Sequence, residues 1–222
     1  MKYLSVFDIV GPSMIGPSSS HTAGAVRMGL LARRIYGRKP AWVKFTLYNS
    51  FAKTGKGHGT DKALIAGILG YNVNDPRIKN SYEYAREEKI NVEFAMMNDP
   101  MRHPNAVDIK LYNEASMLIS GNSLGAGEVA ITSVNRFKVN LRGDYNTLMV
   151  FHKDQPGMIW KVTKYIQDAK ANIAFLQCDR NEKGGESSMV IGLDSILPDD
   201  VISKIQEIAG VYMLRNLEVL EK

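Results

Sequence analysis

The segment from Gly11 to Gly29 constrains the fold of this chain more than any other stretch. It runs GPSMIGPSSSHTAGAVRMG. Pro12 and Pro17 have no backbone N–H, so the segment cannot form a central strand. Apolar residues then recur at helical spacing. The pattern predicts a loop that leads into a helix from about Thr22 to Tyr36, with Ser20 as its N-cap.

Hydroxyl groups and one imidazole gather at the start of this helix. The free N–H groups of a first helical turn attract a carboxylate or a phosphate. The same positive end disfavours a charged ring, so we expect His21 to stay neutral and able to accept a proton. Serine and threonine before a helix often act only as caps, and local chemistry leaves both interpretations open.

A second histidine lies at a similar position. A strand is predicted over 42–48, followed by a glycine-rich segment over 50–61, and Thr60 can cap a helix that runs to about Leu69. His58 lies just before this helix, as His21 lies before the first. The segment is not a P-loop, because Gly57 follows Lys56. The pair of histidines is either functional or a coincidence of two loops.

The rest of the first half predicts helices packed on an antiparallel sheet. Period-two alternation over 92–97, 106–112 and 115–121, separated by short turns, is typical of strands with one covered face. A final strand is expected over 134–141. Gly24 and Gly29 in the first helix would permit a close approach of another backbone or of another chain.

The second half shows strand, helix, strand, strand, helix and strand in that order. The predicted elements cover 147–152, 158–168, 172–178, 187–193, 199–208 and 211–217. This βαββαβ order predicts a ferredoxin-like, four-stranded antiparallel sheet with both helices on one face. We therefore expect an α+β chain with domains at 1–142 and 146–222. Cys178, on an alternating strand, is expected to be a small core or near-core residue and not a nucleophile.

Composition excludes several classes of function. The net charge is +5, but the basic residues are scattered, which argues against a nucleic-acid interface. A mildly basic chain could favour an anionic substrate or an acidic partner. No apolar run reaches the ~18 residues of a membrane helix, and the N-terminus lacks a signal core. The single cysteine rules out an internal disulfide and fits a reducing compartment, so we expect a cytoplasmic protein with no membrane partner.

Three segments together resemble one enzyme family. The segment Gly11–Gly29 closely resembles the signature of the beta chain, or beta domain, of the iron–sulfur-dependent L-serine dehydratases. Asn49–Asp61 resembles the second glycine-rich segment of that family, and Ser123–Val129 resembles the third, with Ala126 where the family often has glycine. The part from about Asn146 resembles an ACT domain, a regulatory amino-acid-binding module.

The resemblance implies a lyase that converts L-serine to pyruvate and ammonia, with a [4Fe–4S] cluster as Lewis acid. Such a cluster needs about three or four cysteine thiolates, and this chain has one cysteine. We therefore expect a separate, cysteine-rich alpha subunit to hold the cluster. This chain would then be the beta subunit, without metal ligands of its own.

The chemistry of the helix starts, together with the resemblance, gives two sets of candidate residues, and the ACT resemblance alone implies a third. The catalytic set is His21, Ser19, Ser20 and Thr22. The set that would bind substrate or another anion is Ser18, Ser19, Ser20, Lys56, Gly57, His58, Gly59 and Thr60. The set that would bind an amino-acid effector in the ACT domain is His152, Asp154, Pro156, Gly157 and Met158. The ACT resemblance also implies self-association, at least to a dimer.

An alternative is a purely regulatory subunit without catalytic residues. Its serine-rich loop would bind an anion or L-serine as an effector. A looser resemblance of the first domain to the allosteric substrate-binding domain of some phosphoglycerate dehydrogenases favours this alternative. A self-sufficient hydrolase is disfavoured, because the Gly-x-Ser-x-Gly motif is absent.

Overall fold

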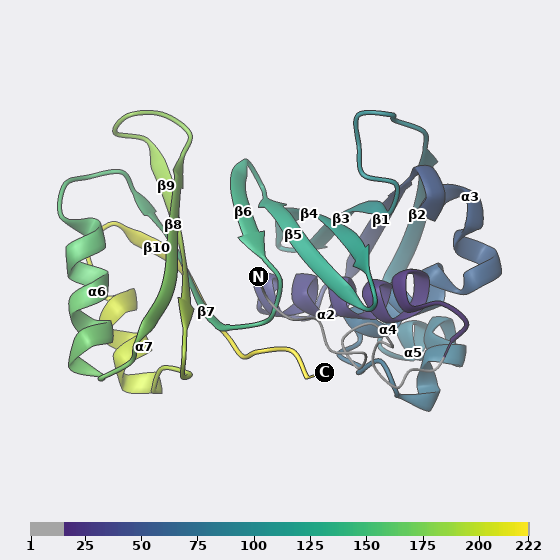
Figure 1. Ribbon diagram of the computed structural model, residues 1–222, viewed down its shortest axis with the longest axis horizontal. Coiled ribbons are helices and arrows are strands. Elements are labelled where there is room, and N and C mark those ends of the chain that lie inside the picture. Colours follow the sequence, from purple (N-terminus) through teal and green to yellow (C-terminus); the bar gives the residue numbers. More distant parts are fainter. Residues whose placement is uncertain (1–15, 222) are drawn as a thin grey trace, which may run out of the picture. The chain divides into compact units, whose positions relative to one another are not determined.

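The computed structural model describes residues 16–221, which divide into two units (Figure 1). The first unit runs to Asn135 and also includes Glu221, and the second runs from Arg136 to Leu220. The boundary therefore falls before the linker expected at 143–146. The first part of the signature segment, residues 11–15, lies outside the described residues. No helix in the described range is long and apolar enough to cross a membrane.

The first unit combines a mixed sheet with short helices (Figure 1). Its helical elements are η1 (Ser19–Ala23), α2 (Gly24–Tyr36), α3 (Asn49–His58), α4 (Thr60–Ile68), η2 (Pro76–Asn80) and α5 (Ser81–Glu87). Its strands are β1 (Trp42–Tyr48), β2 (Asn91–Met97), β3 (Ala106–Asn113), β4 (Ala115–Gly125) and β5 (Glu128–Val134). Neighbouring strands follow the order β2-β1-β3-β4-β5.

One strand of this sheet runs in the direction opposite to our expectation. Strand β2 pairs parallel with β1, from Asn91 opposite Trp42 to Met97 opposite Tyr48. The pairs β1–β3, β3–β4 and β4–β5 are antiparallel. The prediction of an antiparallel sheet is therefore wrong for β2. A parallel pair needs a long crossover, and the helices between β1 and β2 supply it; alternation within β2 carries no information on direction.

Helices α2 and α4 cross where each has a glycine. A Cβ added to Gly29 would lie 2.4 Å from the carbonyl oxygen of Leu64, and one added to Gly67 would lie 2.2 Å from that of Val26. The predicted close approach of another backbone to Gly29 is confirmed. The contact joins the helix that follows His21 to the helix that follows His58.

Two predicted N-caps are wrong. Ser18, not Ser20, is the N-cap: its Oγ accepts the His21 N–H at 3.1 Å, and the π-helical turn η1 leads directly into α2. Helix α4 begins after Gly59, which has a left-handed conformation (φ 68°), and Thr60 makes no capping bond. Three serines are consecutive here, and the sequence alone does not show which of them caps the helix.

The glycine-rich segment after β1 is helical and not a loop. Helix α3 covers Asn49–His58 and includes two glycines, Gly55 and Gly57. Phe51 is fully buried, and Gly55 is buried. Burial of this helix face outweighs the low helix propensity of glycine, which costs roughly 1 kcal/mol per residue relative to alanine.

The second unit has the predicted βαββαβ order. After β6 (Phe137–Leu141) come β7 (Asn146–Lys153), α6 (Met158–Asp168), β8 (Ile173–Arg180), β9 (Glu186–Leu193), α7 (Asp199–Gln206) and β10 (Val211–Leu217). The strands follow the order β10-β7-β9-β8, and all neighbours are antiparallel. Helices α6 and α7 lie on the same face of this sheet (Figure 1). The predicted fold of this unit is confirmed.

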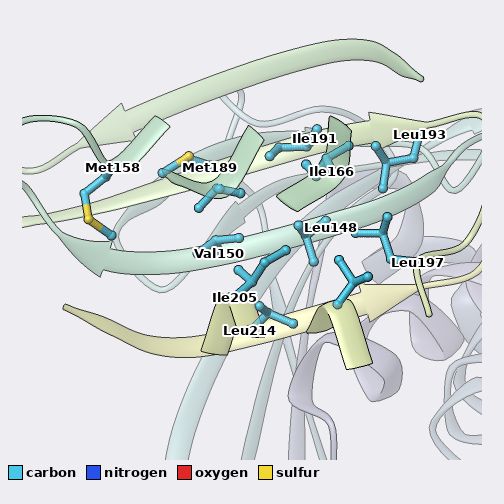
Figure 2. Close-up of a cluster of buried hydrophobic side chains, with 12 residues drawn as sticks. Leu148, Val150, Met158, Ile166, Met189, Ile191, Leu193, Leu197, Ile205 and Leu214 are labelled. Carbon is cyan, nitrogen blue, oxygen red and sulfur yellow. The ribbon is translucent and has the colours of Figure 1, made fainter. Parts of the chain in front are cut away.

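The core of the second unit lies between this sheet and the two helices. Figure 2 shows Val150 and Leu148 of β7 and Met189 of β9 among buried side chains from α6 and α7. Cys178 pairs with Met189 but is exposed. The prediction of a core or near-core position for Cys178 is therefore wrong. Strand β8 is an edge strand, and an alternating pattern does not distinguish an edge strand from a central one.

Candidate functional site

His21 lies among hydroxyl groups from two helix starts. Its Nδ1 is 3.1 Å from Ser20 Oγ and 3.4 Å from Ser18 Oγ. Its Nε2 is 2.9 Å from Thr54 Oγ1 and 3.5 Å from Ser50 Oγ. Both ring nitrogens therefore have hydroxyl partners, on opposite edges of the ring.

His58 lies beside His21. The two ring centroids are 5.0 Å apart, and the Phe51 ring lies 5.1 Å from His21. The Thr22 hydroxyl donates to the carbonyl oxygen of His58 at 3.2 Å, and His58 Nδ1 lies 3.1 Å from the Thr54 carbonyl oxygen. The structure therefore brings together the two histidines that the sequence places 37 residues apart.

The position of His21 favours its neutral form. Partial burial lowers the pKa of His21 below its ordinary 6.5, and the charge of the nearby His58 lowers it further. The direction agrees with the expectation from sequence. In the structure the pKa of His21 is lowered by burial and by a second imidazole, whereas the expectation from sequence rested on the positive end of a helix. A neutral imidazole near pH 7 can accept a proton.

Ser123 supports the turn that carries His21. It is fully buried on β4, and its hydroxyl donates to the Ser20 carbonyl oxygen at 2.9 Å. Gly24 makes room for it, because a Cβ at that position would lie 2.2 Å from Ser123 Oγ. The third segment of the family resemblance therefore packs directly against the first.

Asn49 fixes the helix that carries Ser50 and Thr54. It joins β1 to α3 in a left-handed conformation, with φ at 50°. Its side-chain amide donates to the carbonyl oxygens of Asp99 at 2.8 Å and Arg102 at 3.1 Å. These bonds hold the first turn of α3, and Ser50 in that turn and Thr54 in the next one reach His21.

Sequence reasoning missed three residues of this cluster. Ser50, Thr54 and Ser123 were not among the candidate site residues. Each lies within a segment that carries the family resemblance, and this was the only signal that could have identified them. Spacing along the chain does not show that they converge on His21.

The other candidates for binding an anion are placed differently. Ser18, Ser20 and His58 join the cluster, and Ser19 lies in η1, where its carbonyl oxygen accepts the Gly24 N–H.

Gly57 is exposed on α3, and Gly59 forms the left-handed junction to α4. Thr60 is fully buried, and its hydroxyl has no hydrogen-bond partner in the described part of the chain. Lys56 belongs to α3, but its side chain lies outside what the structure describes.

The five candidate effector residues line one cavity of the second unit. It has a volume of about 430 Å³ and is bounded by His152, Asp154, Pro156, Gly157 and Met158, together with residues of β8 and β9. Asp154 accepts the Gly184 N–H at 2.9 Å, and this bond lowers the pKa of its carboxyl group. His152 is buried, and its Nε2 has no hydrogen-bond partner among residues 16–221.

The residues of this chain do not fit an iron–sulfur cluster. The sequence contains one cysteine, Cys178. Within residues 16–221, no group of three or more His, Cys, Asp and Glu side chains could hold a metal ion. Thiolate ligands for a cluster would have to come from another chain.

Comparisons with known proteins agree with the resemblance of the motifs. A family model described as the serine dehydratase beta chain matches residues 5–89, and an ACT domain model matches residues 146–210. The chain is 37% identical to the probable L-serine dehydratase beta chain of Bacillus subtilis, over 98% of this chain and 99% of that protein. It is 35% identical to the L-serine dehydratase beta chain of Peptoniphilus asaccharolyticus, over 99% of this chain and 100% of the relative. It is 29% identical to a D-3-phosphoglycerate dehydrogenase of Methanocaldococcus jannaschii, over 68% of this chain but 28% of that protein.

Proposed function

The chain belongs to the serine dehydratase beta-chain family and carries an ACT domain, and we propose that it is the beta subunit of an iron–sulfur L-serine dehydratase. With a cluster-bearing alpha chain it would convert L-serine to pyruvate and ammonia. The observation that carries this proposal is the cluster around His21, in which a neutral imidazole is surrounded by hydroxyl groups.

In the proposed reaction His21 takes the α-proton of L-serine. Loss of water from serine requires a base at the α-carbon, and a histidine with a pKa below 6.5 is unprotonated at neutral pH. The hydroxyls of Ser18 and Ser20, on the Nδ1 side of the ring, are placed to hold the substrate carboxylate. Ser19 and Thr22 shape the same turn, Thr22 through its bond to the His58 carbonyl oxygen.

The [4Fe–4S] cluster belongs to the alpha chain in this proposal. When bound, such a cluster supplies a Lewis acid for the departing hydroxyl group. It needs about three or four thiolates, and the one cysteine of this chain is exposed on an edge strand of the ACT domain. A cysteine-rich partner is therefore part of the proposal.

The ACT domain is proposed to bind an amino acid and to mediate self-association. The cavity of about 430 Å³ beside the loop from Asp154 to Gly157 is large enough for a small amino acid. L-Serine is the first candidate ligand, because it would link enzyme activity to substrate supply. These roles are regulatory and are separate from the chemistry at His21.

Reconstitution of the two chains tests the catalytic part of the proposal. We expect His21→Asn to reduce turnover by at least about a hundredfold, which is the lower end of the usual contribution of a general base. The matched control is His103→Asn in the same unit, since an asparagine oxygen can replace the His103 Nδ1 that accepts the Asn105 N–H. Equal activity of the two variants would contradict a catalytic role for His21.

A purely regulatory subunit remains the second candidate function, supported by the similarity to phosphoglycerate dehydrogenases. In that case His21→Asn would change the serine concentration needed for half-maximal rate, or the cooperativity, and would leave kcat unchanged. The same kinetic series therefore separates the two candidates.

A further inference from the structure

The Thr54 hydroxyl has one hydrogen and two neighbours that could receive it. Its Oγ1 lies 2.8 Å from the Ser50 carbonyl oxygen and 2.9 Å from His21 Nε2. The carbonyl oxygen can only accept, so a bond to it uses the hydroxyl hydrogen. In that arrangement Nε2 must be the donor to Thr54, and it must carry the ring proton.

The opposite edge of the ring completes this pattern. The His21 N–H donates to Ser18 Oγ at 3.1 Å, Ser18 Oγ lies 3.3 Å from Ser20 Oγ, and Ser20 Oγ lies 3.1 Å from His21 Nδ1. When Nδ1 carries no proton, the Ser18 hydroxyl donates to Ser20 Oγ and the Ser20 hydroxyl donates to His21 Nδ1. Each hydrogen along this series of bonds then has an acceptor, from the His21 N–H to the Ser50 carbonyl oxygen.

The other neutral tautomer leaves groups without partners. If Nδ1 carried the proton, the Thr54 hydroxyl, 2.9 Å from Nε2 where Ser50 Oγ is 3.5 Å away, would have to donate to Nε2, and its bond to the Ser50 carbonyl oxygen would be lost. Ser20 Oγ would then accept from Nδ1–H, and the Ser20 hydroxyl would donate to Ser18. The Ser18 hydroxyl could no longer donate to Ser20 and would be left without an acceptor. Loss of one net hydrogen bond corresponds to a preference of about fivefold for the Nε2–H tautomer.

We propose that Thr54 is a positioning residue that holds His21 as the Nε2–H tautomer. Nδ1, which faces Ser18 and Ser20, is then the nitrogen that accepts the proton, once the Ser20 hydroxyl has turned from Nδ1 to the substrate carboxylate. The kinetic consequence of this inference depends on the proposed function, but the tautomer itself does not.

The role of Thr54 in the reaction follows from this geometry. As Nδ1 takes up a proton the ring becomes positive, and the Nε2–H bond to Thr54 becomes charge-assisted and stronger. The gain arises when the proton is transferred and not when substrate binds. Loss of the hydroxyl is therefore expected to lower kcat and to leave KM for serine nearly unchanged.

The tautomer can be measured in the full-length chain with ¹⁵N-labelled histidine by NMR at about pH 8, where the ring is neutral. We expect His21 to show a protonated Nε2 and an unprotonated Nδ1. In Thr54→Val, the two nitrogen shifts are expected to move toward each other as the Nδ1–H form gains population. Thr54→Ser keeps the hydroxyl and is expected to restore the original spectrum.

Thr163→Val is the matched control for the loss of a helix-internal bond. Thr163 donates to the Ile159 carbonyl oxygen four residues earlier at 2.9 Å, as Thr54 does to Ser50, but it lies on α6 of the other unit. The substitution removes the same type of bond without a ring partner. It is expected to leave the His21 spectrum and kcat unchanged.

Assembled enzyme gives the second measurement. We expect kcat to fall about fivefold in Thr54→Val and to recover in Thr54→Ser, with KM unchanged in both. A wild-type spectrum with the proton on Nδ1 overturns the proposal, even if Thr54→Val does not fold. An unchanged tautomer in a folded Thr54→Val also overturns it. Failure of His21→Asn to affect turnover would refute the proposed function alone, because the spectrum is read without substrate.

Discussion

Replacing Gly67 with alanine is expected to separate two helices on which the His21 cluster depends. A Cβ at this position would lie 2.2 Å from the Val26 carbonyl oxygen, 2.6 Å from the Leu30 nitrogen and 2.7 Å from the Gly29 Cα. All three are backbone atoms, so no side chain can rotate away. Ordinary contact begins at 3.4 Å, so α2 and α4 would have to move apart by about 1 Å.

The energetic cost follows from two opposing effects. Overpacking of a tight interior contact costs about 1–3 kcal/mol, and three backbone contacts place this substitution at the upper end. Alanine gains about 1 kcal/mol over glycine in a helix interior. We therefore expect a net loss of about 2 kcal/mol, or a decrease in Tm of roughly 4–8 °C for a chain of this size.

Gly57 provides the matched control for this substitution. It lies in α3, and an added Cβ would meet nothing within 4 Å. Gly57→Ala should therefore raise the free energy of unfolding by up to about 1 kcal/mol, through helix propensity alone. Thermal unfolding of the two variants beside wild type measures both. If Gly67→Ala were as stable as Gly57→Ala, the close helix crossing would be refuted.

Two further predictions concern single side chains of the first unit. Thr60→Val should stabilise the chain by about 1 kcal/mol in urea unfolding, because the buried hydroxyl has no hydrogen-bond partner in the described range; a loss of stability would mean that the hydroxyl is satisfied. His21 should make stability depend on pH below 6.5, since its folded pKa is lowered and the unfolded chain binds more protons there. The contribution of neutral His21 to the free energy of unfolding is complete above pH 6.5 and is lost as the pH falls toward the folded pKa. Wild type should therefore lose more stability than His21→Asn between about pH 7.5 and 5.5. Equal losses in urea unfolding would contradict a lowered pKa.

Local pattern predicted much of the architecture. Helical spacing after His21 identified the first helix of the first unit. The order of strands, helices and turns over 147–217 identified the elements of the ACT domain. The small residues of the first helix indicated a close backbone contact, which the crossing at Gly29 and Gly67 confirms. These features depend on residues close together in the sequence, so the periodicity of the chain contains them.

Local pattern was misleading where distant contacts decide the conformation. The glycine-rich segment looks like a loop, yet burial of Phe51 and the anchoring of Asn49 make it helix α3. The direction of β2 depends on the crossover that precedes it and not on its own residues. Cys178 has the alternation of a core strand, but its strand lies at the sheet edge.

The sequence by itself determined the two-part organisation, the family and the presence of one histidine in each of the first two family segments. Only the tertiary structure decided which groups face the Nε2 side of His21 and support its turn, because these groups come from remote segments. Thr54 lies 33 residues from His21, and Ser123 lies 103 residues from Ser20. The direction of each hydrogen bond, and with it the nitrogen that is free to accept a proton, follows from these contacts across the fold. Hydrogen bonds between distant residues leave no periodic trace in the chain, whereas helices and strands do.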